Sequence, residues 1–150
     1  MTMRDQLQTA LKEAMKAKAA DRLSALRLIN AAIKDREIAL RAEGGEVDDA
    51  AILAILGKMV KQRQESARAY EEGGRLELAE KETAEIAVIS EFLPRQLSGE
   101  EVAQAIRDAI AEAGASSIRD MGKVMAVLKA KYTGQMDFGA VGPTVKDMLA

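Results

Sequence analysis

The sequence predicts an all-α protein built as two helical bundles, about four helices followed by a three-helix C-terminal tail. Ala, Leu, Glu, Lys, Arg and Met, which favour helices, dominate the 150 residues. Apolar residues recur three and four positions apart, as in helices that bury one face. Runs of β-branched residues, which strands favour, are short.

The first two helices are predicted from residues 3 to 19 and from about residue 21 to the glycine pair at 44 and 45. Asp21 is the expected N-cap of the second helix, and the glycines are expected to end it. The apolar face of the first helix carries Leu7, Leu11, Ala14 and Met15, and that of the second carries Leu23, Leu26, Ile29 and Ile33.

A third helix is expected to start at Asp48 or Asp49 and to end at the glycine pair at 73 and 74. Its inward face carries Ile52, Leu56, Met59 and Tyr70. The fourth helix takes residues 75–93. It stops before Pro94, because the residue before a proline avoids the α region.

The sequence around Pro94 predicts the boundary between two domains, residues 1–94 and 95–150. Ser98 followed by Glu101 forms a capping box, in which the two side chains satisfy free N–H groups at a helix start. The fifth helix is expected to run from there to Gly114, a C-terminal glycine. Ser117 with Asp120 should open a sixth helix, and Asp137 precedes a short seventh.

The composition excludes several classes of enzyme. The chain has no Cys and no His, which excludes thiol nucleophiles, the usual zinc and haem sites and the Ser-His-Asp type of triad. No phosphate-binding loop, HExxH or Ca²⁺-loop pattern occurs. Most carboxylates lie on polar helix faces beside Lys or Arg, which is typical of solvated ion pairs. We therefore expect no catalytic residues, no metal site and no cofactor.

Charge and aromatic content limit the partners. Lys and Arg number 22 against 24 Asp and Glu, a net charge of −2, so contact with RNA requires a local patch and DNA binding is not expected. Two Tyr and two Phe leave few rings on which bases could stack. The charged N-terminus and the lack of a long uncharged stretch predict no membrane partner and a cytoplasmic protein.

Two groups of polar residues leave alternatives open. Asn30, among apolar neighbours, either hydrogen-bonds across the bundle or points to solvent at its edge. Lys58, Lys61 and Arg68 lie near one line that Glu65 interrupts, which is the pattern of a solvated ion-pair ladder and, less often, of an RNA contact.

The sixth helix contains an unexplained glycine. An interior Gly costs about 1 kcal/mol relative to Ala, yet Gly122, Ala126 and Ala130 form a strip of small residues four apart. Arg119, Lys123, Lys129 and Lys131 surround this strip, while the apolar face carries Met121, Val124, Met125, Leu128 and Tyr132. The strip fits close approach either by the helix that starts at Ser98 or by a phosphate backbone. The spacing alone leaves both open.

Three segments resemble the GatB/YqeY family, which comprises small stand-alone bacterial proteins and the C-terminal region of the B subunit of the tRNA-dependent amidotransferase. They are RLSALRLINAAIKDREI at residues 22–38, the segment from KMVKQ to PRQLS at residues 58–98, and DMGKVMAVLKAKYTGQMDFGAVGPTVKDML at residues 120–149. The segments cover most of the chain, in the family's order and spacing.

The resemblance implies a four-helix bundle followed by a three-helix tail that holds tRNA. In the amidotransferase, catalysis belongs to other parts, so a label of carbon–nitrogen ligase with glutamine as amido-N-donor would be inherited from the larger enzyme. The expected function is an accessory module that binds tRNA, another structured RNA or a tRNA-charging or amidotransferase complex, without catalysis of its own. The alternative is a protein-interaction module that docks a partner helix.

Matched to the family's tail motif, Gly122, Lys123 and Met125 take the positions of its Gly, basic residue and Met. Lys129, Lys131 and Gly134 match its basic approach to a turn glycine. Gln135 departs from the pattern by removing one cation. Pro143 also departs, and predicts that the final helix begins late or kinks.

Overall fold

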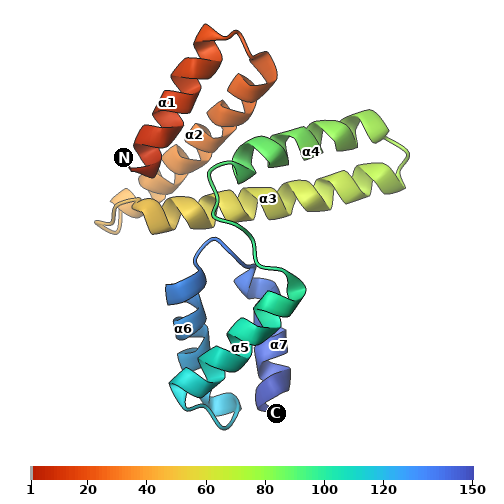
Figure 1. Ribbon diagram of the computed structural model, residues 1–150. Helices are drawn as coiled ribbons and strands as arrows, with labels where there is room; N and C mark the ends of the chain where they lie inside the picture. Colours follow the sequence, from red (N-terminus) through yellow and green to blue (C-terminus); the bar gives the residue numbers. More distant parts are fainter. Residues whose placement is uncertain (1) are drawn as a thin grey trace. The chain divides into compact units, whose positions relative to one another are not determined.

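The computed structural model describes residues 2–150, and this range contains seven α-helices, one short 3-10 turn and no strand (Figure 1). The prediction of an all-α fold is confirmed. The chain divides into two compact units, Met1–Pro94 and Arg95–Ala150, each with its own apolar core. Within residues 2–150 no helix has the length and hydropathy needed to cross a bilayer.

The first unit consists of two helical hairpins (Figure 1). They are formed by α1 (Met3–Lys16) with α2 (Ala20–Arg41) and by α3 (Asp49–Glu72) with α4 (Leu76–Ser90). Its core is built from the apolar faces of all four helices and includes Leu7, Ala14, Leu26, Ile29, Ile33, Ile52, Leu56, Met59 and Ile89. The α3–α4 hairpin extends beyond this core, which is why Tyr70, near its tip, is only half-buried.

Two predictions about α1 and α2 are wrong. Met15 is 54% exposed, because α1 buries Met3, Leu7, Ala10 and Ala14 and Met15 lies about 100° round the helix from Ala14. Asp21 does not cap α2, which begins at Ala20. Asp21 instead lies in the first turn, where a carboxylate interacts favourably with the helix dipole.

The ends of α3 and α4 follow local signals more closely. The Asp48 carboxylate caps α3 by accepting a hydrogen bond of 2.8 Å from the Ala51 N–H. The helix ends before Gly73, as predicted. α4 ends at Ser90, three residues earlier than expected, and the turn that follows lets Phe92 and Leu93 pack on the core.

Polar side chains of the first unit differ in whether they have a partner. The Asn30 side chain is half-buried and forms no hydrogen bond within residues 2–150, which favours the alternative at the edge of the bundle. Arg63 and Glu85 form an ion pair of 2.9 Å between α3 and α4, with side chains only 15% and 16% exposed.

The second unit consists of α5 (Gly99–Ala113), a 3-10 turn (Ile118–Asp120), α6 (Met121–Tyr132) and α7 (Phe138–Leu149) (Figure 1). The capping box at Ser98 and Glu101 is confirmed, with N–H to oxygen distances of 3.2 and 3.0 Å. Gly114 has a φ of +64° at the end of α5, the left-handed conformation that favours glycine. The core is formed by Ala105, Ile106, Ala109, Val124, Leu128, Met136, Val141, Val145 and Leu149.

The start of the sixth helix differs from the prediction. The Ser117 hydroxyl does not cap it. A 3-10 turn precedes α6, and the Asp120 carboxylate accepts a hydrogen bond of 3.0 Å from the Ser116 N–H.

The final helix does not begin late. α7 starts at Phe138, directly after Asp137, whose carboxylate accepts a hydrogen bond of 3.0 Å from the Gly139 N–H. Pro143 lies inside the helix. Burial of Val141, Val145 and Leu149 on one face offsets the backbone hydrogen bond that the proline cannot donate.

Residues 95–97, the first of the second unit, are hydrogen-bonded to later parts of the same unit. Arg95 donates two hydrogen bonds of 2.7 Å to the Glu101 carboxylate. The Leu97 N–H donates to the Gln135 carbonyl at 2.9 Å, and the Gln135 amide donates to the Arg95 carbonyl at 3.1 Å. Gln135 therefore links the start of the unit to the turn after α6.

Candidate nucleic-acid interface on helix α6

The strip of small residues on α6 is exposed. Val124 and Leu128 are fully buried in the core of the second unit, so the opposite face of α6, with Gly122, Ala126 and Ala130, lies in solvent. A Cβ atom added at Gly122 would meet no atom within 4 Å. The alternative that this strip packs on the helix starting at Ser98 is therefore wrong.

The exposed face of α6 is positively charged. The helix has three lysines and no acidic residue. Lys129 and, in the preceding turn, Arg119 are exposed and form no ion pair within residues 2–150. Lys123 is 74% exposed, and its Nζ lies 4.0 Å from the Asp120 carboxylate, too far for a hydrogen bond. These three cations are available to an anionic ligand.

Lys131 does not lie beside the strip, because it comes seven residues after the buried Val124 and so lies on nearly the same side of α6 as that core residue. Its Nζ donates a hydrogen bond to the Glu112 carboxylate on α5. This hydrogen bond, with the attraction of the same carboxylate, raises the pKa of Lys131. Helical spacing does not predict this pair, because its residues are 19 positions apart on different helices.

Gly134 lies beyond the end of α6 and has a conformational role. Its φ of +79° is in the left-handed region that glycine adopts without strain. Its carbonyl accepts a hydrogen bond from the Gln96 side-chain amide. The predicted site residues thus separate into an exposed group, Arg119, Gly122, Lys123 and Lys129, and two residues with partners inside the unit, Lys131 and Gly134.

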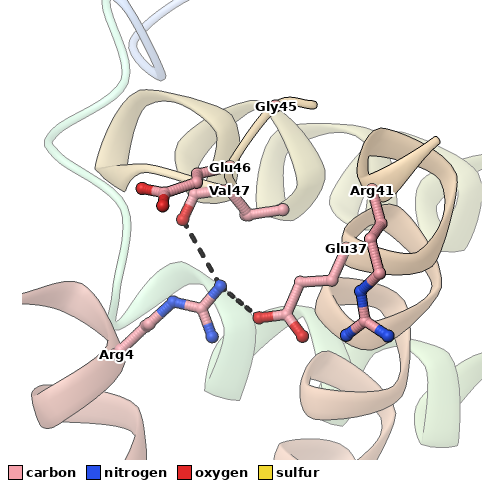
Figure 2. A pocket seen from close by; sticks show the side chains of 6 residues that line it. All are labelled: Arg4, Glu37, Arg41, Gly45, Glu46 and Val47. Atoms are coloured by element: carbon pink, nitrogen blue, oxygen red, sulfur yellow. Dashed lines mark hydrogen bonds and ion pairs between the residues drawn. The ribbon is translucent and has the colours of Figure 1, made fainter. Parts of the chain in front are cut away.

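A hollow of about 410 Å³ in the first unit carries balanced charge (Figure 2). It lies between α1, α2 and the loop before α3 and is lined by Arg4, Glu37, Arg41, Gly45, Glu46 and Val47. Arg4 forms an ion pair with Glu37 and donates a hydrogen bond of 3.4 Å to the Val47 carbonyl. Figure 2 shows Arg4 directed at both partners, so it joins α1 to that loop.

Residues 2–150 hold no group of three His, Cys, Asp or Glu side chains placed to bind a metal ion.

The described residues thus form an all-α protein with four helices in the first unit and three in the second, and the sixth helix has an exposed basic face. The family model described as Yqey-like protein matches residues 4–149, nearly the whole chain. The chain therefore belongs to the Yqey-like family, as its sequence motifs predict.

Three curated relatives share the name altered inheritance of mitochondria protein 41, mitochondrial. The relatives from Clavispora lusitaniae and Meyerozyma guilliermondii are each 38% identical over 87 residues, and the one from Lachancea thermotolerans is 33% identical over 87 residues. Each match covers 58% of this chain. It covers 49% of the Clavispora lusitaniae relative, 44% of the Meyerozyma guilliermondii relative and 46% of the Lachancea thermotolerans relative. The matched region thus spans about half the length of these relatives.

These names contradict one prediction from the sequence. A cytoplasmic location was expected from the charged N-terminus and the absence of a long apolar stretch. All three relatives are named as mitochondrial proteins, which overturns that expectation. The physical reason for the error is that charge and hydropathy bear on whether a helix can enter a bilayer and do not identify a compartment.

Proposed function

We propose that this protein is an accessory RNA-binding module that holds the phosphate backbone of tRNA, or of a related structured RNA, on the exposed face of α6. The observation that carries the proposal is the combination of small side chains and exposed cations on that face. Gly122, Ala126 and Ala130 leave the helix surface free of bulk, and Arg119, Lys123 and Lys129 surround it.

Phosphate contacts suit this surface better than base recognition. Backbone phosphates are bound by Lys and Arg without a defined base sequence, and a smooth helix face lets the sugar-phosphate chain approach closely. The chain has only four aromatic side chains, so base stacking contributes little. We therefore expect affinity that depends strongly on salt and weakly on tRNA sequence.

The module as proposed does no chemistry. The resemblance implies that amide transfer, and with it the label of carbon–nitrogen ligase with glutamine as amido-N-donor, belongs to other parts of the larger amidotransferase. In this reading the chain positions an RNA for a partner complex that acts on it.

Charge removal on α6 tests the proposal. We expect Lys123→Ala and Lys129→Ala each to weaken binding of total tRNA and to reduce the slope of log affinity against log salt by about 0.7–0.9, the value for one phosphate contact. Lys146→Ala, which removes an exposed lysine from α7, is the matched control and should change little. Filter binding at several salt concentrations measures both quantities.

Gly122→Leu tests the steric part of the proposal. The position is open, so leucine should block the RNA backbone without overpacking the core, and it should raise the free energy of unfolding because Leu is the better helix former. Thermal unfolding and tRNA binding are measured on the same sample. If the two lysine variants and Gly122→Leu all bind tRNA as Lys146→Ala does, RNA does not bind on α6, and the strip is better explained as a docking surface for a partner helix.

A further inference from the structure

Helix α2 carries apolar residues on two sides. One side belongs to the core of the first unit and buries Leu26, Ile29 and Ile33. The other side carries Leu28 and Ile38, which are 41% and 57% exposed, and the exposed Ala31. At about 100° per residue, these three residues and Asp35 share an arc of about 80°. We call these four residues the α2 seam, an apolar face that Asp35 interrupts once.

A row of cations follows one edge of the α2 seam. It consists of Arg27, Lys34 and Arg41, which are seven residues apart. Seven residues make nearly two turns and advance about 10.5 Å, so the three side chains lie almost in line along the helix. All three are exposed and form no ion pair within residues 2–150. The opposite edge of the seam carries uncharged alanines, Ala32 and Ala39.

The α2 seam has the spacing of one strand of a short coiled coil. Its members follow one another by three, four and three residues, from Leu28 to Ile38. Charged residues beside such a seam form ion pairs with the facing helix and thereby select it. A single polar residue within the seam fixes the register of pairing at some cost in affinity, and Asp35 suits this role.

A second copy of α2 is a poor partner for this seam. Antiparallel pairing of two copies brings the same edge of both helices together, so the two rows of cations repel each other. Parallel pairing in register places one Asp35 carboxylate opposite the other. The row of cations instead complements a helix with Asp or Glu along its edge.

We infer that the α2 seam docks an amphipathic helix of another protein, with an apolar seam of its own and carboxylates along the edge that faces Arg27, Lys34 and Arg41. This surface belongs to the first unit, so the inference does not depend on RNA binding by α6. Under the proposed function, the α2 seam is where the partner complex attaches.

Two synthetic peptides, each about four heptads long, test the inference on the full chain. One has Leu along its seam, a central Asn to face Asp35, and Glu along both edges. The other has Lys in place of every Glu. We expect the Glu peptide to bind and to gain helicity, and the Lys peptide to bind about tenfold more weakly, because three ion pairs are replaced by repulsion. Fluorescence anisotropy of labelled peptide measures affinity, and circular dichroism measures helicity.

Variants of α2 assign the binding to the seam and its cations. Lys34→Glu should weaken binding of the Glu peptide about three- to tenfold and strengthen binding of the Lys peptide. Arg36→Glu is the matched control, because this exposed residue lies about 160° round the helix from Lys34. Ile38→Gln should weaken binding of the Glu peptide about tenfold by removing apolar contact. All three side chains are exposed, so the variants should keep the fold.

The inference is overturned if neither peptide binds, if both bind alike, or if Lys34→Glu and Ile38→Gln bind the Glu peptide as Arg36→Glu does. A dimer detected by light scattering and abolished by Ile38→Gln would make a second copy the occupant. If neither peptide binds and Lys34→Glu weakens tRNA binding, the row of cations contacts RNA instead. Binding of tRNA by the α6 variants is measured separately, so the proposed function can fail without affecting this result.

Discussion

Lys18, with a φ of +53°, is the one non-glycine residue from 2 to 150 whose backbone is in the left-handed region. It follows the end of α1, where the Lys18 and Ala19 N–H groups donate to the Met15 and Ala14 carbonyls at 3.3 and 3.0 Å. This hydrogen-bond pattern ends many helices, usually with glycine in the left-handed position. The lysine Cβ makes this conformation costly.

Lys18→Gly should therefore stabilise the protein. Removing the Cβ relieves about 1–2 kcal/mol, of which about 0.4–1 kcal/mol is offset by the greater freedom of glycine in the unfolded chain. We expect the free energy of unfolding to rise by about 0.5–1 kcal/mol, measured by urea denaturation. Lys12→Gly, at an exposed position inside α1, is the control and should lower it by about 1 kcal/mol. A loss of stability in Lys18→Gly would show that the lysine side chain contributes a contact at this turn.

At the scale of the elements, the N-terminus of α5 depends on one carboxylate. Glu101 accepts hydrogen bonds from the Ser98 N–H at 3.0 Å and from Arg95. The hydrogen bond from Arg95 is the main cause, and that from the Ser98 backbone the second, of a fall in the pKa of Glu101 from 4.5 to about 2. Ionised Glu101 thus joins the start of the second unit to its first helix, and protonation of this carboxylate weakens the link.

The lowered pKa predicts a dependence of stability on pH. Because the pKa is lower in the folded state, Glu101 contributes its full stabilisation above about pH 4.5, and this is lost as the pH falls towards 2. Glu101→Gln should lack this contribution, so its unfolding temperature should fall less steeply over that window than that of the unchanged protein. Thermal unfolding in steps from pH 7 to pH 2 makes the comparison, with Glu100→Gln as control. Parallel curves for the protein and Glu101→Gln would mean that the Arg95 interaction does not persist in solution.

At the scale of the whole molecule, the two units are expected to be separate domains that fold alone. Each has a core of its own, Met1–Pro94 around Ile29 and Leu56 and Arg95–Ala150 around Ile106 and Leu128. Residues 95–97, at the start of the second unit, form hydrogen bonds with later residues of that unit. The place where a fragment starts should therefore affect its stability.

We predict that a fragment of residues 95–150 unfolds cooperatively and at a higher temperature than a fragment of residues 98–150. The shorter fragment lacks the hydrogen bonds of Arg95 and Leu97 and the packing of Leu97 on the core. We expect it to lose about 1–3 kcal/mol of stability, since a typical hydrogen bond contributes about 0.5–1.5 kcal/mol. Circular dichroism melts measure the difference. Equal melting temperatures, or an unfolded 95–150 fragment, would contradict the prediction.

The sequence by itself determined the helical class, the family and most helix ends in this protein. The caps at Asp48, Ser98 and Gly114 can be predicted from the sequence, because a capping side chain or a left-handed glycine acts on backbone groups only a few residues away. The caps predicted at Asp21 and Ser117 from residue type alone are wrong. α2 begins one residue before Asp21, and a 3-10 turn separates Ser117 from α6. The face of α6 that carries the small residues also follows from helical spacing alone.

Only the tertiary structure decided what surrounds that face. Spacing places Gly122 and Lys131 on the same helix, but it does not say that α6 turns its glycine to open solvent. Nor does it say that α5 places Glu112 beside Lys131, or that Gln135 meets Arg95 across 40 positions of sequence. The physical reason is the distance along the sequence over which each effect acts. Capping and helical periodicity act over a few residues. Exposure and ion pairing depend on which distant segments are brought together by the core within each unit.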